Sequence, residues 1–303
     1  MKRYSFFIIL CFALSFTMQA QHQTLAKHVV LIGLDGWAAH DFENPQNNVP
    51  NILSLMQGGS YTMHKRSVVP ASSAINWASM FMGVEPEMHG YTTWGSMEPE
   101  MPSIITNENG IFPTIFSVIR EQCPEAETGC SFDWNGIKYL IDTLAVSHVM
   151  CFPEDYDLVE ANCDSVVRYI IEKKPTFYIP YFGGIDDAGH HHGGWYSDGY
   201  YNYVARIDQC IGRIIQALID AGIYNETIII VTGDHGGHNY SHGTTDIKDM
   251  ETPLVFFGKN VRSGYQIQEP VVQYDIAATV AYILGLETPS AWRGKPTTEI
   301  FNR

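Results

Sequence analysis

The sequence predicts an α/β protein whose mostly parallel sheet is covered by helices on both faces. Apolar strands alternate with amphipathic helical segments along the chain, which is the pattern of repeated β-α-β units. Several of the predicted strands are continuous apolar runs, as expected for strands buried on both faces of a parallel sheet. We find no internal repeat, low-complexity tract or linker. Residues 21–303 are therefore expected to form one domain.

The elements of the first third of the chain can be placed in order. The run HVVLIGLDG predicts a strand at residues 28–36. Apolar residues at helical spacing predict a helix at 49–58. Residues 67–83 indicate a short extended stretch, a break at a proline, and a helix whose first turn is capped by Ser72 or Ser73.

The rest of the chain repeats this alternation of helices and strands. The predicted elements are a helical segment at 155–173, a strand at 176–186, a helix at 198–221, strands at 227–237 and 253–258, and a final helix at 274–286.

Composition limits the classes of partner. With 303 residues and 45% hydrophobic content, the chain can bury a large core. Lys and Arg number 18 against 33 Asp and Glu, a net charge of -15, so a nucleic-acid duplex or an anionic membrane would be repelled. A small anionic substrate stays compatible, because bound cations would dominate the field inside a site.

The N-terminus resembles a secretory signal peptide. Lys2 and Arg3 precede an apolar run at 6–16, and small and polar residues follow. A membrane anchor is the alternative, but the run is shorter than the ~20 residues that a span needs. We expect residues 1–20 to be removed, with an exported mature protein, periplasmic or secreted, that begins near Gln21.

Removal of this segment leaves an odd number of cysteines. Cys123 and Cys130 bracket a short polar loop and are the expected disulfide. No pair has CxxC spacing, so we interpret the cysteines as structural rather than as metal ligands. The five are Cys123, Cys130, Cys151, Cys163 and Cys210.

Three aspartates stand at the ends of predicted strands. Asp35, Asp186 and Asp234 each close an apolar run. Because ligand sites of open parallel sheets lie at the carboxyl ends of the strands, we expect the three carboxylates to converge. Their mutual repulsion would require cations at that edge.

Histidines accompany two of these aspartates. His190 lies four positions after Asp186, which lets both side chains face one ion. His235 follows Asp234 directly, and His242 comes seven positions later. Carboxylates and imidazoles are ligands that suit zinc, and two sites of about three protein ligands each would leave positions open for substrate.

Three further histidines are alternatives. His191 and His192 extend the run after His190, and we interpret both as flanking residues. His238 competes with His242, and we prefer His242 because it stands before Gly243, a setting that the family resemblance described next also has.

These motifs together resemble the nucleotide pyrophosphatase/phosphodiesterase branch of the alkaline phosphatase superfamily. The match runs in order over nearly all of the chain from residue 28 onward, and it implies an alkaline-phosphatase-like fold. The motifs are LIGLDG with Asp35, PASSAIN with Ser73, PEMHGY with His89, DDAGH from Asp186 to His190, GDHGG with Asp234 and His235, and the pair His242-Gly243.

The resemblance implies two zinc ions and places the nucleophile on Ser73, where that branch more commonly has Thr. A hydroxyl at a helix N-terminus and beside zinc would have a lowered pKa. Ser72 is the alternative hydroxyl and would otherwise cap the helix. The implied ligands are Asp186, His190 and His242 for one ion, and Asp35, Asp234, His235 and the Ser73 oxygen for the other.

The implied activity is hydrolysis of phosphodiester or nucleotide pyrophosphate bonds through a covalent phosphoserine intermediate, on a small phosphate ester or nucleotide. A phosphate monoesterase and a phosphonate hydrolase are the enzymatic alternatives. A metal-dependent phosphate- or nucleotide-binding protein would not need the Ser73 hydroxyl. A sulfatase is disfavoured, because residues 73–77 lack the x-P-x-R that follows the sulfatase nucleophile.

The chain departs from the branch at Trp94, where an Asn usually donates to a phosphoryl oxygen. The indole N–H can donate one hydrogen bond, and Thr92 or Thr93 are alternative donors. We also expect Trp94 and Tyr91 to bind substrate by stacking on a nucleobase, whereas Trp77 is expected in the core.

Cations are scarce near the predicted nucleophile. Between Ser73 and Ile119 the chain has no Lys or Arg. Lys65 and Arg66 precede Ser73 on an extended segment and are expected to face solvent, which leaves Lys248 as a downstream candidate. Because a monoester dianion usually needs such a cation, the sequence favours diesters as substrates.

Overall fold

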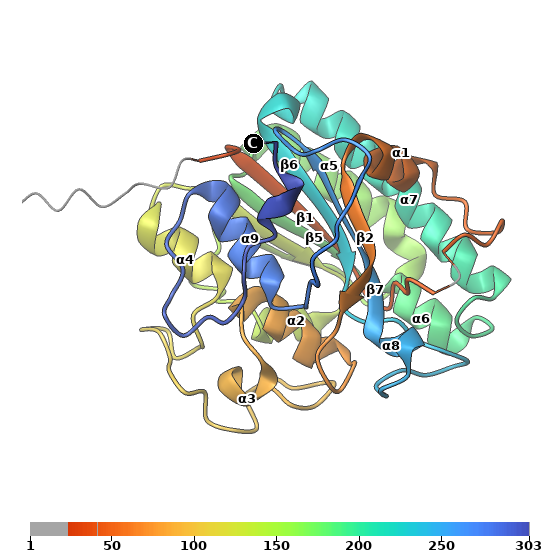
Figure 1. Ribbon diagram of the computed structural model, residues 1–303, viewed down its shortest axis with the longest axis horizontal. Helices are drawn as coiled ribbons and strands as arrows, with labels where there is room; N and C mark the ends of the chain where they lie inside the picture. Colours follow the sequence, from red (N-terminus) through yellow and green to blue (C-terminus); the bar gives the residue numbers. More distant parts are fainter. Residues whose placement is uncertain (1–23, 41, 303) are drawn as a thin grey trace, which may run out of the picture.

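The computed structural model describes residues 24–40 and 42–302. Its centre is an eight-stranded sheet in the order β4-β3-β5-β1-β6-β7-β2-β8, with helices on both faces (Figure 1). The strands are β1 (His28–Leu34), β2 (Ser60–Arg66), β3 (Thr128–Phe132), β4 (His148–Cys151), β5 (Phe177–Phe182), β6 (Thr227–Gly233), β7 (Glu251–Gly258) and β8 (Tyr265–Gln266).

Five neighbouring strands, β4-β3-β5-β1-β6, run parallel. The strand β7 is antiparallel to both β6 and β2. The predicted mostly parallel sheet is therefore confirmed. The strands β3, β4 and β8 were not predicted, and β2 was expected only as an extended segment at Lys65 and Arg66, because these strands are short or carry polar residues that weaken the apolar signal.

The central strand β1 separates two hydrophobic clusters. Val29 and Leu31 pack on one face with the helices α2 (Ser73–Met82), α4 (Ile115–Gln122) and α9 (Asp275–Leu284) (Figure 1). Val30 and Ile32 pack on the other face with α1 (Pro50–Gly58), α5 (Val159–Lys173) and α7 (Asp198–Asp220). Because successive side chains of a strand point to opposite faces, a continuous apolar strand needs a helical layer on each side.

Each helix expected from the sequence is present, whereas the helices at 86–89, 115–122, 184–191 and 247–250 were not expected. The segment expected to be a strand through residue 186 ends at Phe182, and the chain enters the helix α6 two residues later. The helices are α1 (Pro50–Gly58), α2 (Ser73–Met82), α3 (Pro86–His89), α4 (Ile115–Gln122), α5 (Val159–Lys173), α6 (Gly184–His191), α7 (Asp198–Asp220), α8 (Ile247–Met250) and α9 (Asp275–Leu284), with 3-10 turns η1 (Asn135–Tyr139), η2 (Tyr156–Leu158), η3 (Tyr224–Glu226) and η4 (Thr298–Ile300).

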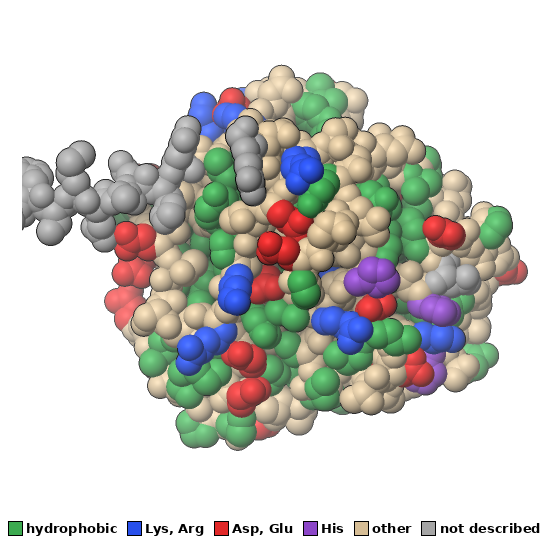
Figure 2. All heavy atoms as spheres, viewed as in Figure 1, with side chains coloured by type: hydrophobic (Ala, Val, Ile, Leu, Met, Phe, Trp, Pro, Cys, Tyr) green, Lys and Arg blue, Asp and Glu red, His purple; other side chains and the backbone are tan. Residues whose placement is uncertain are grey.

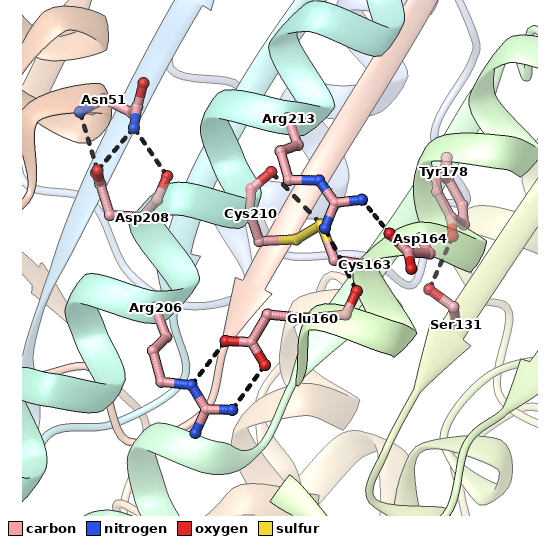
Figure 3. Close-up of a disulfide and its surroundings, with 10 residues drawn as sticks. All are labelled: Asn51, Ser131, Glu160, Cys163, Asp164, Tyr178, Arg206, Asp208, Cys210 and Arg213. Carbon is pink, nitrogen blue, oxygen red and sulfur yellow. Dashed lines mark hydrogen bonds and ion pairs between the residues drawn. A yellow bond between two sulfur atoms is a disulfide. The ribbon is translucent and has the colours of Figure 1, made fainter. Parts of the chain in front are cut away.

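The predicted disulfide is wrong. Cys163 on α5 and Cys210 on α7 form the disulfide instead, with their Cα atoms 5.9 Å apart (Figure 3). Cys130 is buried in β3 and Cys123 is exposed after α4, and both are free thiols. Proximity in sequence was a poor guide, because the packing of α5 against α7 sets which cysteines meet.

Ion pairs reinforce the same helix pair. The guanidinium of Arg206 on α7 donates to both carboxylate oxygens of Glu160 on α5, each at 2.8 Å, and Arg213 pairs with Asp164 (Figure 3). These contacts and the disulfide hold α5 and α7 together behind the strands β5 and β1.

No helix in the described ranges is long and apolar enough to cross a bilayer. The expected signal peptide at residues 1–20 lies outside the described residues. On the face drawn in Figure 2, Lys and Arg side chains are scattered among acidic ones and do not gather into a broad basic patch, in keeping with the acidic composition.

Candidate active site

The carboxyl ends of β1, β5 and β6 bring the predicted aspartates to one edge of the sheet. Asp35 follows β1 directly, and Asp234 follows β6. Asp186 lies in the first turn of α6, so the expectation that it closes a strand is wrong although its position at the edge is right. Gly36 makes this approach feasible: its φ is +69°, and a Cβ there would lie 2.8 Å from the Asp186 Cα.

One group of ligand atoms comprises Asp35, Asp234 and His235, within 4.8 Å of one another. The His235 Nε2 lies 3.4 Å from Asp35 Oδ1 and 3.3 Å from Asp234 Oδ2. The Ser73 hydroxyl donates to Asp35 Oδ1 at 3.4 Å and lies 3.2 Å from His235 Nε2. All four members of the second predicted ligand set therefore meet.

A second group comprises Asp186, His235 and His242. The His242 Nε2 lies 3.6 Å from Asp186 Oδ1, and the His190 Nε2 lies 3.5 Å from Asp186 Oδ2. His190 and Asp186 are one helical turn apart on α6, which explains why their four-residue spacing points both side chains the same way. The first predicted ligand set also converges, with His235 between the two groups.

The competing histidines belong to neither group of ligand atoms. The His238 Nδ1 is 2.7 Å from Asp249 Oδ1. His191 and His192 approach Asp187, at 3.9 and 3.3 Å. His191 nevertheless lines the same cavity as Ser73, with its ring 5.9 Å from that of His190.

Backbone carbonyls orient the three converging histidines in the same way. The Nδ1 atoms of His190, His235 and His242 lie 2.8–2.9 Å from the carbonyl oxygens of Tyr240, Gly236 and Ala71. A carbonyl only accepts, so each Nδ1 carries the proton and each Nε2 presents a lone pair to the carboxylates. Hydrogen bonds of this kind typically fix imidazoles that bind metals.

Two aromatic side chains hold Asp35. Its Oδ2 accepts from the Tyr181 hydroxyl at 2.5 Å and from the Trp77 indole N–H at 3.0 Å. Both rings are buried, as expected for Trp77. The sequence did not identify these two roles, because neither residue belongs to a motif with an acid or a histidine.

The chemistry of the donor set fits cations. Asp186 Oδ1 and Asp234 Oδ2 are buried and have no hydrogen-bond partner within the described part of the chain. Burial raises the pKa of Asp35, Asp186 and Asp234, and burial lowers the pKa of His235 to about 4 and that of His242 to about 3. Neutral imidazoles beside buried carboxylates that lack counter-charges form a site that metal ions would satisfy.

The helix α2 presents the predicted nucleophile. Ser73 is its first residue and lines a cavity of about 590 Å³ that also contains Asp35, Asp186 and His190. Ser72 occupies the N-cap position, as one of the two expected alternatives, but its side chain makes no capping hydrogen bond.

Asn76 sets the turn before α2, and the sequence did not indicate this role. Its Oδ1 accepts from the Val68 N–H at 2.7 Å, while its Nδ2 donates to the carbonyls of Pro70 and Ser72 at 3.1 and 3.0 Å. The amide of Asn76 therefore fixes the chain that carries Ser73.

The two aromatic residues predicted to bind substrate lie in the loop after α3 and differ in their exposure to solvent. Trp94 is 69% exposed and lines the cavity, and its carbonyl accepts from the Ala74 N–H at 3.1 Å. Tyr91 is only 3% exposed and donates to the carbonyl of Tyr139. The expected stacking role of Tyr91 is therefore wrong, because no face of its ring is free.

Other residues of that loop are structural. His89 is buried, with Nε2 3.0 Å from the Ser79 hydroxyl. Thr92 and Thr93 both donate to Glu100, which ties the loop together. Of the groups considered as replacements for the usual Asn, Trp94 lines the cavity and the two threonines do not.

The burial of Lys65 corrects the expectation that its side chain faces solvent. Its side chain is fully buried, and the Nζ donates to the carbonyl of Gly233 at 2.8 Å and to Oε1 of Gln273. Burial lowers its pKa to about 7. Arg66 is exposed as expected, beside Glu251, and Lys248 does not line the cavity.

The comparisons with known proteins agree with this geometry. Residues 29–254 match the type I phosphodiesterase/nucleotide pyrophosphatase family. Mouse ectonucleotide pyrophosphatase/phosphodiesterase family member 1 is 23% identical over 222 residues, which cover 68% of this chain and 24% of that protein. The human bis(5′-adenosyl)-triphosphatase ENPP4 is 21% identical over 220 residues, which cover 70% of this chain and 48% of that protein. The chain thus spans less than half the length of these curated relatives.

Solved structures show the same fold. Human ectonucleotide pyrophosphatase/phosphodiesterase 5 aligns with a TM-score of 0.72 and 16% identity, over 91% of this chain and all of that one. A phosphonate monoester hydrolase from Silicibacter pomeroyi aligns with a TM-score of 0.68 and 15% identity, over 89% and 75%. The fold and the site define a protein of the alkaline phosphatase superfamily. Within it, the chain belongs to the type I phosphodiesterase/nucleotide pyrophosphatase family.

Replacement of Lys65 tests its role beneath the site. Lys65→Met would remove the donor of Gln273 Oε1 and the closer donor of the Gly233 carbonyl, which would keep only the Thr232 hydroxyl at 3.4 Å, so we expect the free energy of unfolding to fall by about 2 to 4 kcal/mol. Lys173→Met, on the exposed end of α5, is the matched control and should change it by less than about 0.5 kcal/mol. Urea unfolding followed by circular dichroism measures both. Equal midpoints for the two variants would contradict the assignment.

The buried carboxylates predict how metal stabilisation depends on pH. Their pKa values are raised above the unfolded value of about 3.9, so the metal-free folded protein retains protons that the unfolded chain has released. It therefore loses stability as pH rises, whereas bound zinc replaces those protons. We expect the rise in Tm on replacing chelator with zinc to grow from pH 5 to pH 8, to about 5 to 10 °C. Scanning calorimetry at both pH values gives the result; an equal shift at each would count against the site.

Proposed function

We propose that this protein hydrolyses phosphodiester or nucleotide pyrophosphate bonds with two zinc ions and a covalent intermediate on Ser73. The observation that carries this proposal is the position of the Ser73 hydroxyl. It lies at the start of α2, within 3.4 Å of Asp35 and 3.2 Å of His235, and on the wall of the cavity. A protein that only bound phosphate would not need a hydroxyl there.

The residues that would hold the ions are the two converging sets. Asp186, His190 and His242 would hold one ion, and Asp35, Asp234, His235 and Ser73 the other. Zinc ions there would supply positive charge to the attacking and leaving oxygens of an in-line displacement.

Ser73 and the N-terminus of α2 would carry out the remaining parts of the reaction. The Ser73 hydroxyl gives up its proton to water as its oxygen forms a bond to phosphorus, and the leaving oxygen takes the electron pair of the ester bond that breaks and is protonated by water. Water then hydrolyses the phosphoserine ester and restores the hydroxyl. Because the N-terminus of α2 carries partial positive charge, it stabilises negative charge that develops beside Ser73.

We also propose that the protein acts outside the cytoplasm, after removal of residues 1–20. The disulfide between Cys163 and Cys210 supports this location, because disulfides persist in oxidising compartments.

Serine variants test the choice of nucleophile. Ser73→Ala is expected to lower kcat at least about 1,000-fold, since the covalent step is lost, while the remaining acids and imidazoles still bind zinc. Ser72→Ala is the matched control: its side chain makes no capping bond, so turnover should stay within a few fold and stability within about 0.5 kcal/mol. Steady-state kinetics and zinc analysis of both proteins decide. Comparable losses in the two variants would show that Ser73 is the wrong hydroxyl.

The choice of ester tests the charge argument against the monoesterase alternative. Among residues 24–40 and 42–302, no Lys or Arg lines the cavity, so this part of the chain offers a dianionic monoester no such cation for its extra charge. We expect kcat/KM for the 4-nitrophenyl ester of thymidine 5′-monophosphate to exceed that for 4-nitrophenyl phosphate at least about tenfold, which corresponds to about 1.4 kcal/mol. The two are compared at matched pH and zinc. A tenfold preference for the monoester would instead identify a phosphatase.

A further inference from the structure

The indole of Trp195 lies between segments that carry the predicted metal ligands. Trp195 belongs to the turn between α6 and α7 and is only 5% exposed. A Cβ on Gly189 of α6 would lie 2.6 Å from this ring, and a Cβ on Gly237, after β6, would overlap it. Glycine at both positions therefore lets α6 and the segment after β6 pack directly on the indole.

The ring of Trp195 contacts two of the predicted ligands. Its centroid lies 5.0 Å from that of His190, with the ring planes at 85°, and 5.8 Å from that of His242, with the planes at 64°. Both are edge-to-face arrangements, which are favourable for aromatic pairs. With Asp186, these two histidines form the set that would hold one of the ions. The indole thus lies against both imidazoles of that set.

Hydrogen bonds fix the position of Trp195 itself. Its indole N–H donates to the carbonyl of Gly36 at 3.0 Å, and its backbone N–H donates to the carbonyl of Asn239 at 2.7 Å. Asn239 directly precedes Tyr240, whose carbonyl oxygen lies 2.9 Å from the Nδ1 atom of His190. The residue that packs against His190 therefore also anchors the segment that orients it.

This packing matters because His190 lies in a partly open setting. Its side chain is 30% exposed, and Tyr240, which supplies its backbone acceptor, is 61% exposed. A single hydrogen bond to an exposed segment would leave the imidazole several rotamers, and metal binding would then cost side-chain entropy. Groups that hold metal ligands in place typically change metal affinity about 10- to 100-fold when they are replaced.

We propose that Trp195 is a positioning residue for one of the two ions, the one that Asp186, His190 and His242 would hold. The inference rests on the proposed function and adds a determinant of metal affinity that is not itself a ligand. Trp195 acts through the two imidazoles that its ring contacts. Its loss should therefore weaken that ion far more than the ion beside Ser73.

Two substitutions separate the ring from its N–H group. Trp195→Leu removes the aromatic ring, whereas Trp195→Phe keeps a smaller ring and removes the donor. The Gly36 carbonyl would still accept from the Tyr200 hydroxyl, which lies 3.3 Å away. We expect Trp195→Leu to weaken the affinity for one zinc ion about 10- to 100-fold, and Trp195→Phe to weaken it about threefold or less. Competition with a chromophoric chelator at pH 8 measures both affinities.

A double-mutant cycle assigns the loss to one ion. His190→Ala should reduce the zinc content from two ions to one and leave the ion beside Ser73. In that background, addition of Trp195→Leu should change the affinity of the remaining ion by less than about threefold. A loss of about tenfold or more in that background would overturn the proposal, because Trp195 would then act on both ions.

Trp292→Leu is the matched control for the loss of a buried indole. Trp292 is 7% exposed, its indole N–H donates to the carbonyl of Pro113 at 2.9 Å, and it does not line the cavity. Its replacement should lower the urea midpoint of the metal-free protein, as Trp195→Leu does, yet leave both zinc affinities within about twofold. If Trp195→Leu weakened zinc binding no more than Trp292→Leu, the proposal would fail.

A spectroscopic measurement supplies a second readout in which the indole of Trp195 is retained. In protein labelled with 5-fluorotryptophan, the fluorine resonance that is missing from Trp195→Phe belongs to Trp195. Because the ring contacts His190 and His242, this resonance should shift when zinc is added, and it should shift much less in His190→Ala. A resonance that zinc leaves unchanged in the native sequence would overturn the proposal even if Trp195→Leu does not fold.

Zinc binding and turnover are measured separately, so the two proposals can fail independently. A protein that binds zinc in the pattern expected here but hydrolyses no phosphodiester would refute the proposed function and leave this inference standing. Active protein whose Trp195→Leu variant binds zinc as tightly as the native protein would refute the inference alone. A chain that binds no zinc would refute both.

Discussion

The structure depends on three carboxylates that are buried together at one edge of the sheet. Asp35 and Asp234 are almost completely shielded from solvent, and Asp186 lies beside them on α6. Burial disfavours their charged forms, and each carboxylate is further disfavoured by its neighbours. An arrangement of this kind is costly in an empty protein and becomes favourable when cations fill it. The surrounding architecture is best understood as support for that set of charges.

The support comes from elements that are far apart in sequence. The indole N–H of Trp77 and the hydroxyl of Tyr181 donate hydrogen bonds to Asp35. Backbone carbonyls fix the tautomers of three histidines. Lys65 donates to the carbonyl of Gly233, which immediately precedes Asp234. The parallel strands deliver the acids to one edge, and α2 delivers Ser73 to the same place. The segments after β3 and β4 line the same cavity with the rings of Trp134 and Tyr156 and the carboxylate of Glu154.

The sequence predicted the parts of this arrangement that follow from periodicity and chain order. Apolar runs closed by Asp35 and Asp234 gave the buried strands and the acids at their ends, and a four-residue spacing gave the pairing of Asp186 with His190. The sequence did not predict the features that depend on tertiary packing, which are the burial of particular side chains and the pairing of the cysteines. The side chain of Lys65 is buried although its strand β2 is mostly polar. Tyr91 is buried as well, whereas Trp94 in the same loop is exposed. The disulfide joins Cys163 and Cys210 because α5 packs against α7, and no local sequence pattern indicates that contact.

The number and position of bound metals test the account most directly. Crystals of zinc-loaded protein, measured on both sides of the zinc absorption edge, reveal each ion as an anomalous peak. We predict two peaks per chain, one among Asp186, His190 and His242 and the other beside Asp35, Asp234, His235 and the Ser73 oxygen. Catalytically active protein with a single peak, or with no peak at these residues, would contradict the account.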